Sequence, residues 1–236
     1  MSNNVPEATV ARLPVYQRAL IELVREGASS TSSEQIASMA RVNASKVRKD
    51  LSFLGSFGTR GSGYDTGYLL EQIDRALGLD RSWPVAIVGL GNLGRALANS
   101  QGFSSRGFFL CGLFDVDPSI LGSRIAGVLV RHVDEIGADP DRAASPAIGV
   151  VATPAAYAQE VADRLVAAGV GCLLNFAPRV LSVPPHVLLR YVDLSIELQV
   201  MSFYLSHRGA GPGVPAGSAI SAAASLPHPV GMNAGA

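Results

Sequence analysis

A glycine-rich turn at residues 89–94 constrains the fold of this chain more than any other feature. Its six residues are Gly89, Leu90, Gly91, Asn92, Leu93 and Gly94. The turn follows the apolar run VAIV at 85–88, and strand, turn and helix in this order are the fingerprint of dinucleotide-binding Rossmann domains. Gly89 permits a tight turn, Gly91 lets the backbone approach a pyrophosphate, and Gly94 lets helix and strand pack closely. We expect the pyrophosphate at the helix N-terminus, where free N–H groups favour an anion.

An acidic residue ends the next apolar run at the spacing that this fingerprint requires. Asp115 closes the segment FFLCGLFD and lies 21 residues after Gly94. An acid at about this distance binds the adenosine ribose 2′-hydroxyl and repels a 2′-phosphate. Val116 follows, with no arginine to bind such a phosphate. The sequence therefore predicts a site for NAD(H) in preference to NADP(H).

Apolar strands and helical stretches alternate through the rest of this region. The runs AIGVVATP at 147–154 and GCLLNFAP at 171–178 flank a helical pattern at 155–168. This alternation predicts an α/β fold with a doubly wound parallel sheet, which binds ligands at the carboxyl ends of its strands. We expect the nicotinamide side of the site to include Thr153, Pro154, Asn175 and Phe176. Phe176 fits an ordinary core position equally well.

The N-terminal part predicts three helices followed by a ribbon. A first helix begins near Leu13–Pro14 and ends at Gly27, and a capping box from Thr31 to Glu34 starts a second. A third runs from Ala44 to Leu54, and alternate glycines at 57–64 suit a ribbon tip. A connecting helix then ends at Gly78. We predict a winged helix-turn-helix domain at 1–80, a Rossmann domain at 81–208 and a disordered tail at 209–236. We expect residues 1–12 to form a loose arm and Trp83–Pro84 to mark the boundary between the first two domains.

The third helix, within a helix-turn-helix at about 16–55, carries the candidate DNA contacts. Val47, Leu51 and Leu54 are spaced to face the core. The remaining faces carry Ser45, Lys46, Arg48, Lys49 and Ser52. Such side chains reach base edges and phosphates in a major groove, and Thr59 and Arg60 in the ribbon tip are placed to enter an AT-rich minor groove. The alternative is a solvated basic face without a partner.

Composition bears on partners and compartment. The formal net charge is zero, but residues 41–60 carry five basic side chains against one acid, Asp50. No apolar run of about eighteen residues predicts a membrane span, and the first residues lack a signal-peptide core, so we expect a cytoplasmic protein. Cys111 and Cys172 lie in apolar runs and are expected to be buried and reduced, although a thiol switch is an alternative.

The sequence offers no catalytic or metal-binding group. None of its histidines (His132, His186, His207 and His228) stands in a catalytic context, and neither a Tyr-x-x-x-Lys pair nor zinc-ligand spacing occurs. We therefore expect a protein that binds the dinucleotide as a signal, and not an enzyme. Two rivals remain: a small NAD-dependent oxidoreductase with a fused helical arm, and a regulator that senses another nucleotide such as CoA.

These motifs together resemble the Rex family of redox-sensing transcriptional repressors of Gram-positive bacteria. The matching segments are VNASKVRKDLSFLGSFGTRGSGY, IVGLGNLGRALAN, FDVDP, VATP, NFAP and VDLSIELQ. The resemblance covers nearly everything from Pro6 to His207. The resemblance implies a homodimer that binds AT-rich palindromic operator DNA and leaves it when NADH binds. NAD⁺ competes weakly, so expression of respiration and fermentation genes follows the NADH/NAD⁺ ratio.

The resemblance also assigns roles near the C-terminus. The apolar stretch at 194–207 corresponds to a helix swapped between subunits, and its several apolar faces predict burial on several sides. The family pattern pairs Asp193, just before this helix, with a polar group for which Arg18 is the candidate. Many members carry a tyrosine after the fingerprint helix, where this chain has Ser100.

Overall fold

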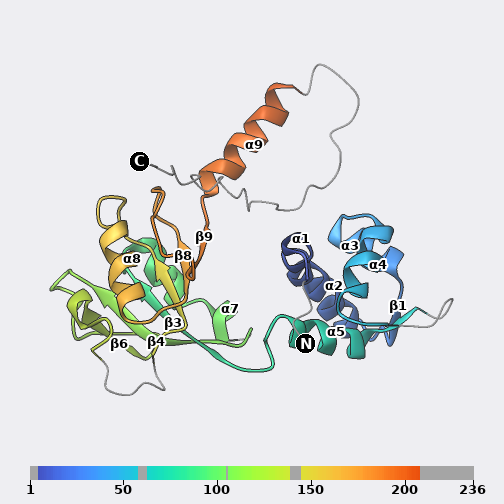
Figure 1. Ribbon diagram of the computed structural model, residues 1–236, viewed down its shortest axis with the longest axis horizontal. Coiled ribbons are helices and arrows are strands. Elements are labelled where there is room, and N and C mark those ends of the chain that lie inside the picture. Colours follow the sequence, from blue (N-terminus) through green and yellow to red (C-terminus); the bar gives the residue numbers. More distant parts are fainter. Residues whose placement is uncertain (1–4, 58–62, 105, 139–144, 208–236) are drawn as a thin grey trace, which may run out of the picture. The chain divides into compact units, whose positions relative to one another are not determined.

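The computed structural model describes residues 5–57, 63–104, 106–138 and 145–207, in two compact units that divide between Ile73 and Asp74 (Figure 1). The helices of the first unit are α1 Glu7–Val10, α2 Leu13–Arg25, α3 Ser33–Ala40, α4 Ala44–Ser52 and α5 Thr66–Ala76, the last crossing the division. Strand β1 at Ser30–Thr31 pairs antiparallel with β2 at Tyr64–Asp65. Helices α2, α3 and α4 with the two-stranded ribbon make the predicted N-terminal DNA-binding fold.

One apolar core holds these helices together. Its fully buried side chains are Leu13, Tyr16, Leu20, Leu23, Ile36, Val47, Leu51, Leu69 and Ile73. Their three- and four-residue spacing on α2 and α4 puts one stripe of each helix inward. Val24 adjoins the stripe on α2 but is exposed.

Two local expectations for this unit are wrong. Ser32, and not Thr31, caps α3, since its hydroxyl accepts a hydrogen bond from the Gln35 N–H at 3.1 Å. Thr31 is held extended by its pairing with Tyr64 in the ribbon, so it stands one residue too early to cap the helix. Part of the expected loose arm is the short helix α1, whose Thr9 is buried against the core.

The second unit is a seven-stranded sheet in the order β5-β6-β4-β3-β7-β8-β9. Its strands are β3 Trp83–Val88, β4 Phe108–Asp115, β5 Arg124–Ile125, β6 Val128–His132, β7 Ile148–Val151, β8 Cys172–Asn175 and β9 Leu188–Tyr191. All neighbours are parallel except the β5–β6 pair. The order reverses direction at β3, which is the Rossmann topology predicted from the sequence.

Alternate residues of the central strand face two helical layers. Val85 and Ile87 pack with α6 (Asn92–Ala98), whereas Ala86 and Val88 pack with α8 (Ala158–Ala167) on the other face. The short helix α7 spans Gln101–Ser104, and a 3₁₀ turn, η1, spans Val133–Glu135. Helices on both faces explain why β3 is apolar throughout.

Several details of the second unit differ from expectation. Trp83–Pro84, which the sequence suggested as an inter-domain boundary, begins β3, and the indole N–H of Trp83 donates to Gly78 O at 2.8 Å. Strands β6 and β9 were not predicted, since Arg131 and Arg190 interrupt their apolar runs. Cys111 and Cys172, which were expected to be buried, are both partly exposed.

The last helix, α9 at Leu194–Ser206, buries none of its residues within the chain. Its exposed side chains include Leu194, Ile196, Leu198, Val200, Met201, Phe203, Tyr204 and Leu205. The expected burial is therefore wrong for a single subunit. Within the described ranges, none of these helices has the length and apolarity to cross a membrane.

Candidate dinucleotide and DNA sites

The turn between β3 and α6 has the backbone geometry that its glycines predict. Gly89 has φ +94°, and a Cβ there would lie 2.7 Å from the carbonyl of Ala152. A Cβ on Gly94 would overlap the carbonyl oxygen of Gly89. Both glycines are therefore required by close packing inside the protein, whatever the turn binds.

Gly91 differs from these two glycines in having open space beside it. It caps the N-terminus of α6, and a Cβ there would meet no atom within 4 Å. Asn92 and Leu93, the first two residues of the helix, are exposed. Backbone N–H groups at an open helix N-terminus fit a pyrophosphate, so the space at Gly91 agrees with the predicted ligand.

Asp115 ties the glycine turn to the end of β4. Its Oδ2 accepts from the Leu90 N–H at 2.5 Å, and its Oδ1 accepts from the N–H groups of Val116 at 2.7 Å and Asp117 at 2.9 Å. A carboxylate has about four acceptor positions, so one remains for a ribose hydroxyl. The side chain therefore both shapes the turn and fits the predicted role.

A residue that the sequence reasoning missed, Arg95, also contacts the turn. Its Nε donates to the carbonyl of Leu90 at 2.7 Å from an exposed position on α6. Hydrogen bonds from Ser119, with a smaller contribution from the nearby Arg95 charge, lower the pKa of Asp117. The position of Arg95 directly after Gly94, the third glycine of the fingerprint, could have marked Arg95 as a neighbour of the turn.

Thr153 provides an independent indication of a ligand at this edge of the sheet. It follows β7, and its Cγ2 lies where a side chain on Gly89 would stand. Its hydroxyl is buried and has no hydrogen-bond partner among the described residues. A buried unpaired hydroxyl is costly, and a ligand on the glycine turn would relieve that cost. Pro154 beside it is exposed.

Asn175 and Phe176 follow β8 at the same edge. The Asn175 amide is buried, donates to the carbonyls of Ala177 and Arg179, and accepts from the Ala177 N–H. Both of its donor hydrogens serve the loop, so Asn175 shapes the edge and has no N–H left for a ligand. Phe176 is partly buried against the core on the α6 face, the same face as the glycine turn.

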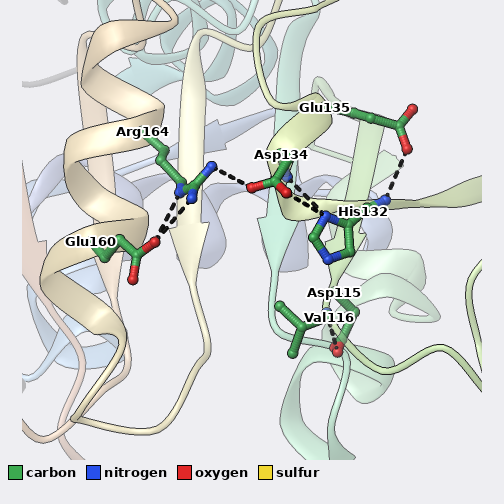
Figure 2. Close-up of polar contacts among 7 residues, drawn as sticks. All are labelled: Asp115, Val116, His132, Asp134, Glu135, Glu160 and Arg164. Atoms are coloured by element: carbon green, nitrogen blue, oxygen red, sulfur yellow. Dashed lines mark hydrogen bonds and ion pairs between the residues drawn. The ribbon is translucent and has the colours of Figure 1, made fainter.

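A chain of polar and charged side chains lies beside this edge, on β6, η1 and α8 (Figure 2). His132 Nδ1 is 3.1 Å from Asp134 Oδ2, and Asp134 Oδ1 accepts from Arg164 at 2.7 Å. Arg164 also pairs with Glu160 at 2.9 Å, which raises the pKa of its guanidinium. Sequence reasoning passed over His132 because β6 itself was not predicted. Among the described residues, no group of three or more His, Cys, Asp or Glu side chains could hold a metal ion.

The first unit presents α4 as its basic face. Ser45, Lys46, Arg48, Lys49 and Ser52 are all exposed, while Val47 and Leu51 are buried and Leu54 is partly buried. Lys46 and Lys49 are the only lysines in the 236-residue sequence. Asn43 caps the helix by accepting from the Ser45 N–H at 2.8 Å. Exposed donors on one helix match the geometry of a recognition helix.

Two acidic residues contact this helix in different ways. Glu34 on α3 pairs with Arg48 at 2.8 Å, and both side chains are exposed. Asp50, the one acid within 41–60, points inward and is buried. It accepts hydrogen bonds from Arg12, Tyr16 and Thr9. The outer face of α4 therefore carries no acidic group of its own.

The remaining candidate residues lie in both units or outside the described residues. Thr59 and Arg60 lie outside the described residues. Arg18 is exposed on α2 in the first unit. Asp193 belongs to the second, where it caps α9 by accepting from the Ser195 N–H and hydroxyl, which lowers its pKa. Ser100 precedes α7 and accepts from the Gly102 N–H at 3.2 Å.

Family comparisons match the two units separately. Residues 4–52 match the family described as "Putative DNA-binding protein N-terminus", and residues 80–179 match the CoA binding domain family. The first range contains α1 to α4, and the second contains the glycine turn and the strand ends after β4, β6, β7 and β8. Both matches therefore cover the candidate sites.

Whole-chain comparisons give one family. The chain is 56% identical to the redox-sensing transcriptional repressor Rex of Streptomyces avermitilis, over 95% of this chain and 88% of that protein. It is 46% identical to the Rex protein of Desulfitobacterium hafniense, over 87% and 98%. A crystal structure of RSP with β-NAD⁺ and operator DNA has a TM-score of 0.81 at 38% identity, covering 87% of this chain and 94% of RSP. The structure of RSP, a Rex-family repressor, with β-NADH has a TM-score of 0.78 at 36% identity, covering 87% and 96%.

Proposed function

Because this chain belongs to the Rex family of redox-sensing transcriptional repressors, we propose that it binds operator DNA as a homodimer and releases it when NADH binds. One observation carries the proposal: a recognition-type helix with only basic and hydroxyl groups on its exposed side shares a chain with a dinucleotide turn. RSP, its structural relative, has been crystallised with operator DNA and with both oxidation states of the dinucleotide. A bacterial repressor acts at the chromosome, so the proposal includes a cytoplasmic location.

The glycine turn provides the dinucleotide site of the proposal. Gly89, Leu90, Gly91, Asn92, Leu93 and Gly94 would hold the pyrophosphate, and Asp115 the adenosine ribose. Asp115 would place negative charge at the ribose, which disfavours the 2′-phosphate of NADP(H). Thr153, Pro154 and Phe176 would lie at the nicotinamide end, with the loop held by Asn175.

The preference for NADH follows from the charge of the nicotinamide. The oxidised ring is cationic and the reduced ring is neutral. Burial of an unpaired charge beside an apolar ring such as Phe176 is costly, so the neutral form binds better. Coupling between sites is reciprocal, and operator DNA should weaken NADH binding by the factor with which NADH weakens DNA binding, about 5–150-fold.

The exposed helix α9 supports the dimer. Eight large apolar side chains on one 13-residue helix form a patch that a monomer rarely leaves in water. Insertion of α9 into a second subunit, as the family pattern implies, would bury them. Asp193 at its N-cap would then pair with Arg18 in one of the two states of the dimer.

A mobility-shift titration tests the function. Chain bound to an AT-rich palindromic promoter fragment should dissociate with NADH at concentrations where NAD⁺ has little effect. A shuffled fragment of equal length and base composition controls for nonspecific binding, and each titration is run at two salt concentrations because DNA affinity depends on salt. A complex that survives saturating NADH contradicts the proposal.

The match of residues 80–179 to the CoA binding domain family favours a second candidate function, that of a CoA sensor. The ribose acid does not separate the two ligands, because CoA also carries a free adenosine 2′-hydroxyl. Thermal melting of the chain in the presence of each ligand separates these two candidates. NADH should raise the melting temperature more than CoA at equal concentration, and the reverse result would favour the second candidate.

A further inference from the structure

His132 ends β6 directly beside Asp115 at the end of β4. The two residues are partners in the parallel register of these strands, and neighbouring strands lie about 4.8 Å apart. Partners in a parallel register have side chains on the same face of the sheet, so the His132 and Asp115 side chains share one face at this edge of the sheet (Figure 2). The adenosine half of a dinucleotide bound to Asp115 passes this point.

One nitrogen of the imidazole is occupied and the other is available. Nδ1 lies 3.1 Å from Asp134 Oδ2 and 3.3 Å from the Asp134 N–H, and it can serve only one of them at a time. The carboxylate contact is shorter and charge-assisted, so we place the proton on Nδ1. Nε2 then has a free lone pair, no hydrogen-bond partner among the described residues, and a side chain that is 38% exposed.

The groups behind the ring restrict its movement. Asp134 is held by Arg164, which is in turn held by Glu160 one turn earlier on α8. The backbone N–H of His132 donates to Glu135 Oε1 at 3.1 Å, so the backbone and the ring of His132 are both held by hydrogen bonds. An exposed histidine without such partners would sample several rotamers, whereas this one is oriented in advance.

We propose that His132 is a specificity-determining residue for the adenosine half of the dinucleotide, with Nε2 accepting a hydrogen bond from a ribose hydroxyl or from the adenine amino group. The inference rests on the proposed function, because it needs a dinucleotide on the glycine turn. Asp134 and Arg164 are positioning residues that act through His132. The ligand class is an adenosine with free ribose hydroxyls, as in NADH or ADP-ribose.

A structural role must be separated from this one, because Nδ1 of His132 also contacts the Asp134 carboxylate at the start of η1. His132→Asn keeps an amide N–H near the position of Nδ1 and so retains the contact with Asp134, but it lacks Nε2. His132→Gln places its amide near the position of Nε2 and lacks the atom that contacts Asp134. Recognition by Nε2 predicts weak binding with normal stability for His132→Asn, and nearly normal binding with reduced stability for His132→Gln. A purely structural role predicts the reverse order of binding.

Calorimetric titration of the full chain with three probes tests the proposal. His132→Asn should weaken ADP-ribose and NADH binding about three- to tenfold, the worth of one hydrogen bond, and should leave reduced nicotinamide mononucleotide, which lacks adenosine, unchanged. His186→Asn, an exposed histidine before β9, is the matched control and should bind all three probes normally.

The outcomes separate this inference from the proposed function. Unchanged ADP-ribose affinity in His132→Asn overturns the role of His132, as does an equal loss for the mononucleotide. A wild-type chain that binds ADP-ribose but keeps operator DNA in the presence of NADH overturns only the proposed function. A wild-type chain that binds neither ADP-ribose nor NADH overturns both.

Discussion

Asp50 and Arg12 form a two-pronged ion pair between the candidate recognition helix and the segment that precedes α2. Arg12 Nε lies 2.6 Å from Asp50 Oδ2, and Arg12 Nη2 lies 2.7 Å from Asp50 Oδ1. The Asp50 side chain is 2% exposed and that of Arg12 is 25% exposed. With hydrogen bonds from Tyr16 and Thr9, the pair fixes α4 against α1 and α2, so the orientation of the exposed basic side of α4 is set by contacts on its opposite side.

Replacement of Asp50 by alanine should destabilise the first unit by about 3 kcal/mol, because a partly buried guanidinium and two hydroxyls lose their shared acceptor. Urea unfolding measures the change. Glu26→Gln, which removes an exposed acid at the end of α2, should change the free energy of unfolding by less than about 0.5 kcal/mol. Equal effects of the two variants would mean that the Asp50 network adds no stability.

The same pair predicts a loss of stability in acid. Burial alone would raise the pKa of Asp50, but hydrogen bonds from Arg12, Tyr16 and Thr9 outweigh it and hold the pKa below its usual value of 3.8. A lowered folded-state pKa contributes stability that is present above the unfolded-state value and is lost as pH falls through the folded-state value. The stability gap between wild type and Asp50→Asn should therefore be constant near neutral pH and shrink below pH 3.8. A gap that persists to lower pH would contradict this assignment.

Two glycines of one turn should respond differently to alanine. Gly91→Ala adds a methyl group in open space, so the protein should fold normally while NADH affinity falls by about tenfold or more, since the methyl occupies the pyrophosphate approach. Gly94→Ala forces α6 away from the carbonyl of Gly89 and should lower both the melting temperature and the affinity. Differential scanning fluorimetry and NADH titration on the same samples test both. Normal NADH binding by Gly91→Ala would exclude the turn as the pyrophosphate site.

Removal of either lysine should weaken DNA binding in a salt-dependent way. If Lys46 or Lys49 contacts a phosphate, its replacement by alanine should lower the slope of log affinity against log salt by about 0.9. Fluorescence anisotropy with labelled operator DNA between low and moderate salt measures this slope. Arg25→Ala, an exposed cation at the end of α2, is the control and should leave the slope unchanged. If all three variants share the wild-type slope, α4 is not the phosphate-contacting helix.

A charge on α9 should disrupt the dimer. Leu198 and Phe203 are 65% and 58% exposed in one subunit, and burial of such a side chain is worth about 1.5–3 kcal/mol. Leu198→Asp should shift the chain from dimer to monomer in sedimentation velocity runs at micromolar concentration. Val180→Asp, at an apolar position that is 69% exposed outside α9, should remain dimeric. A dimeric Leu198→Asp variant would place the interface elsewhere.

Features that depend on near neighbours in the chain could be predicted. The glycine turn between β3 and α6, the inward stripe of α4 and the acid at the end of β4 follow from local spacing and periodicity, and the structure agrees with each. Backbone sterics decide where only glycine fits, and a 3.6-residue period decides which side of a helix is apolar. The basic outer face of α4 is determined in the same way.

Features that depend on partners distant in the chain were decided by the tertiary structure. Asp50 looks like one exposed acid in a basic segment, and only the fold brings Thr9 and Arg12 to it. His132 became significant when β6 was placed beside β4, and the Asn175 amide turned out to be used by its own loop. Side-chain hydrogen bonds and strand pairings form between segments whose approach depends on the whole core, so local patterns cannot specify them.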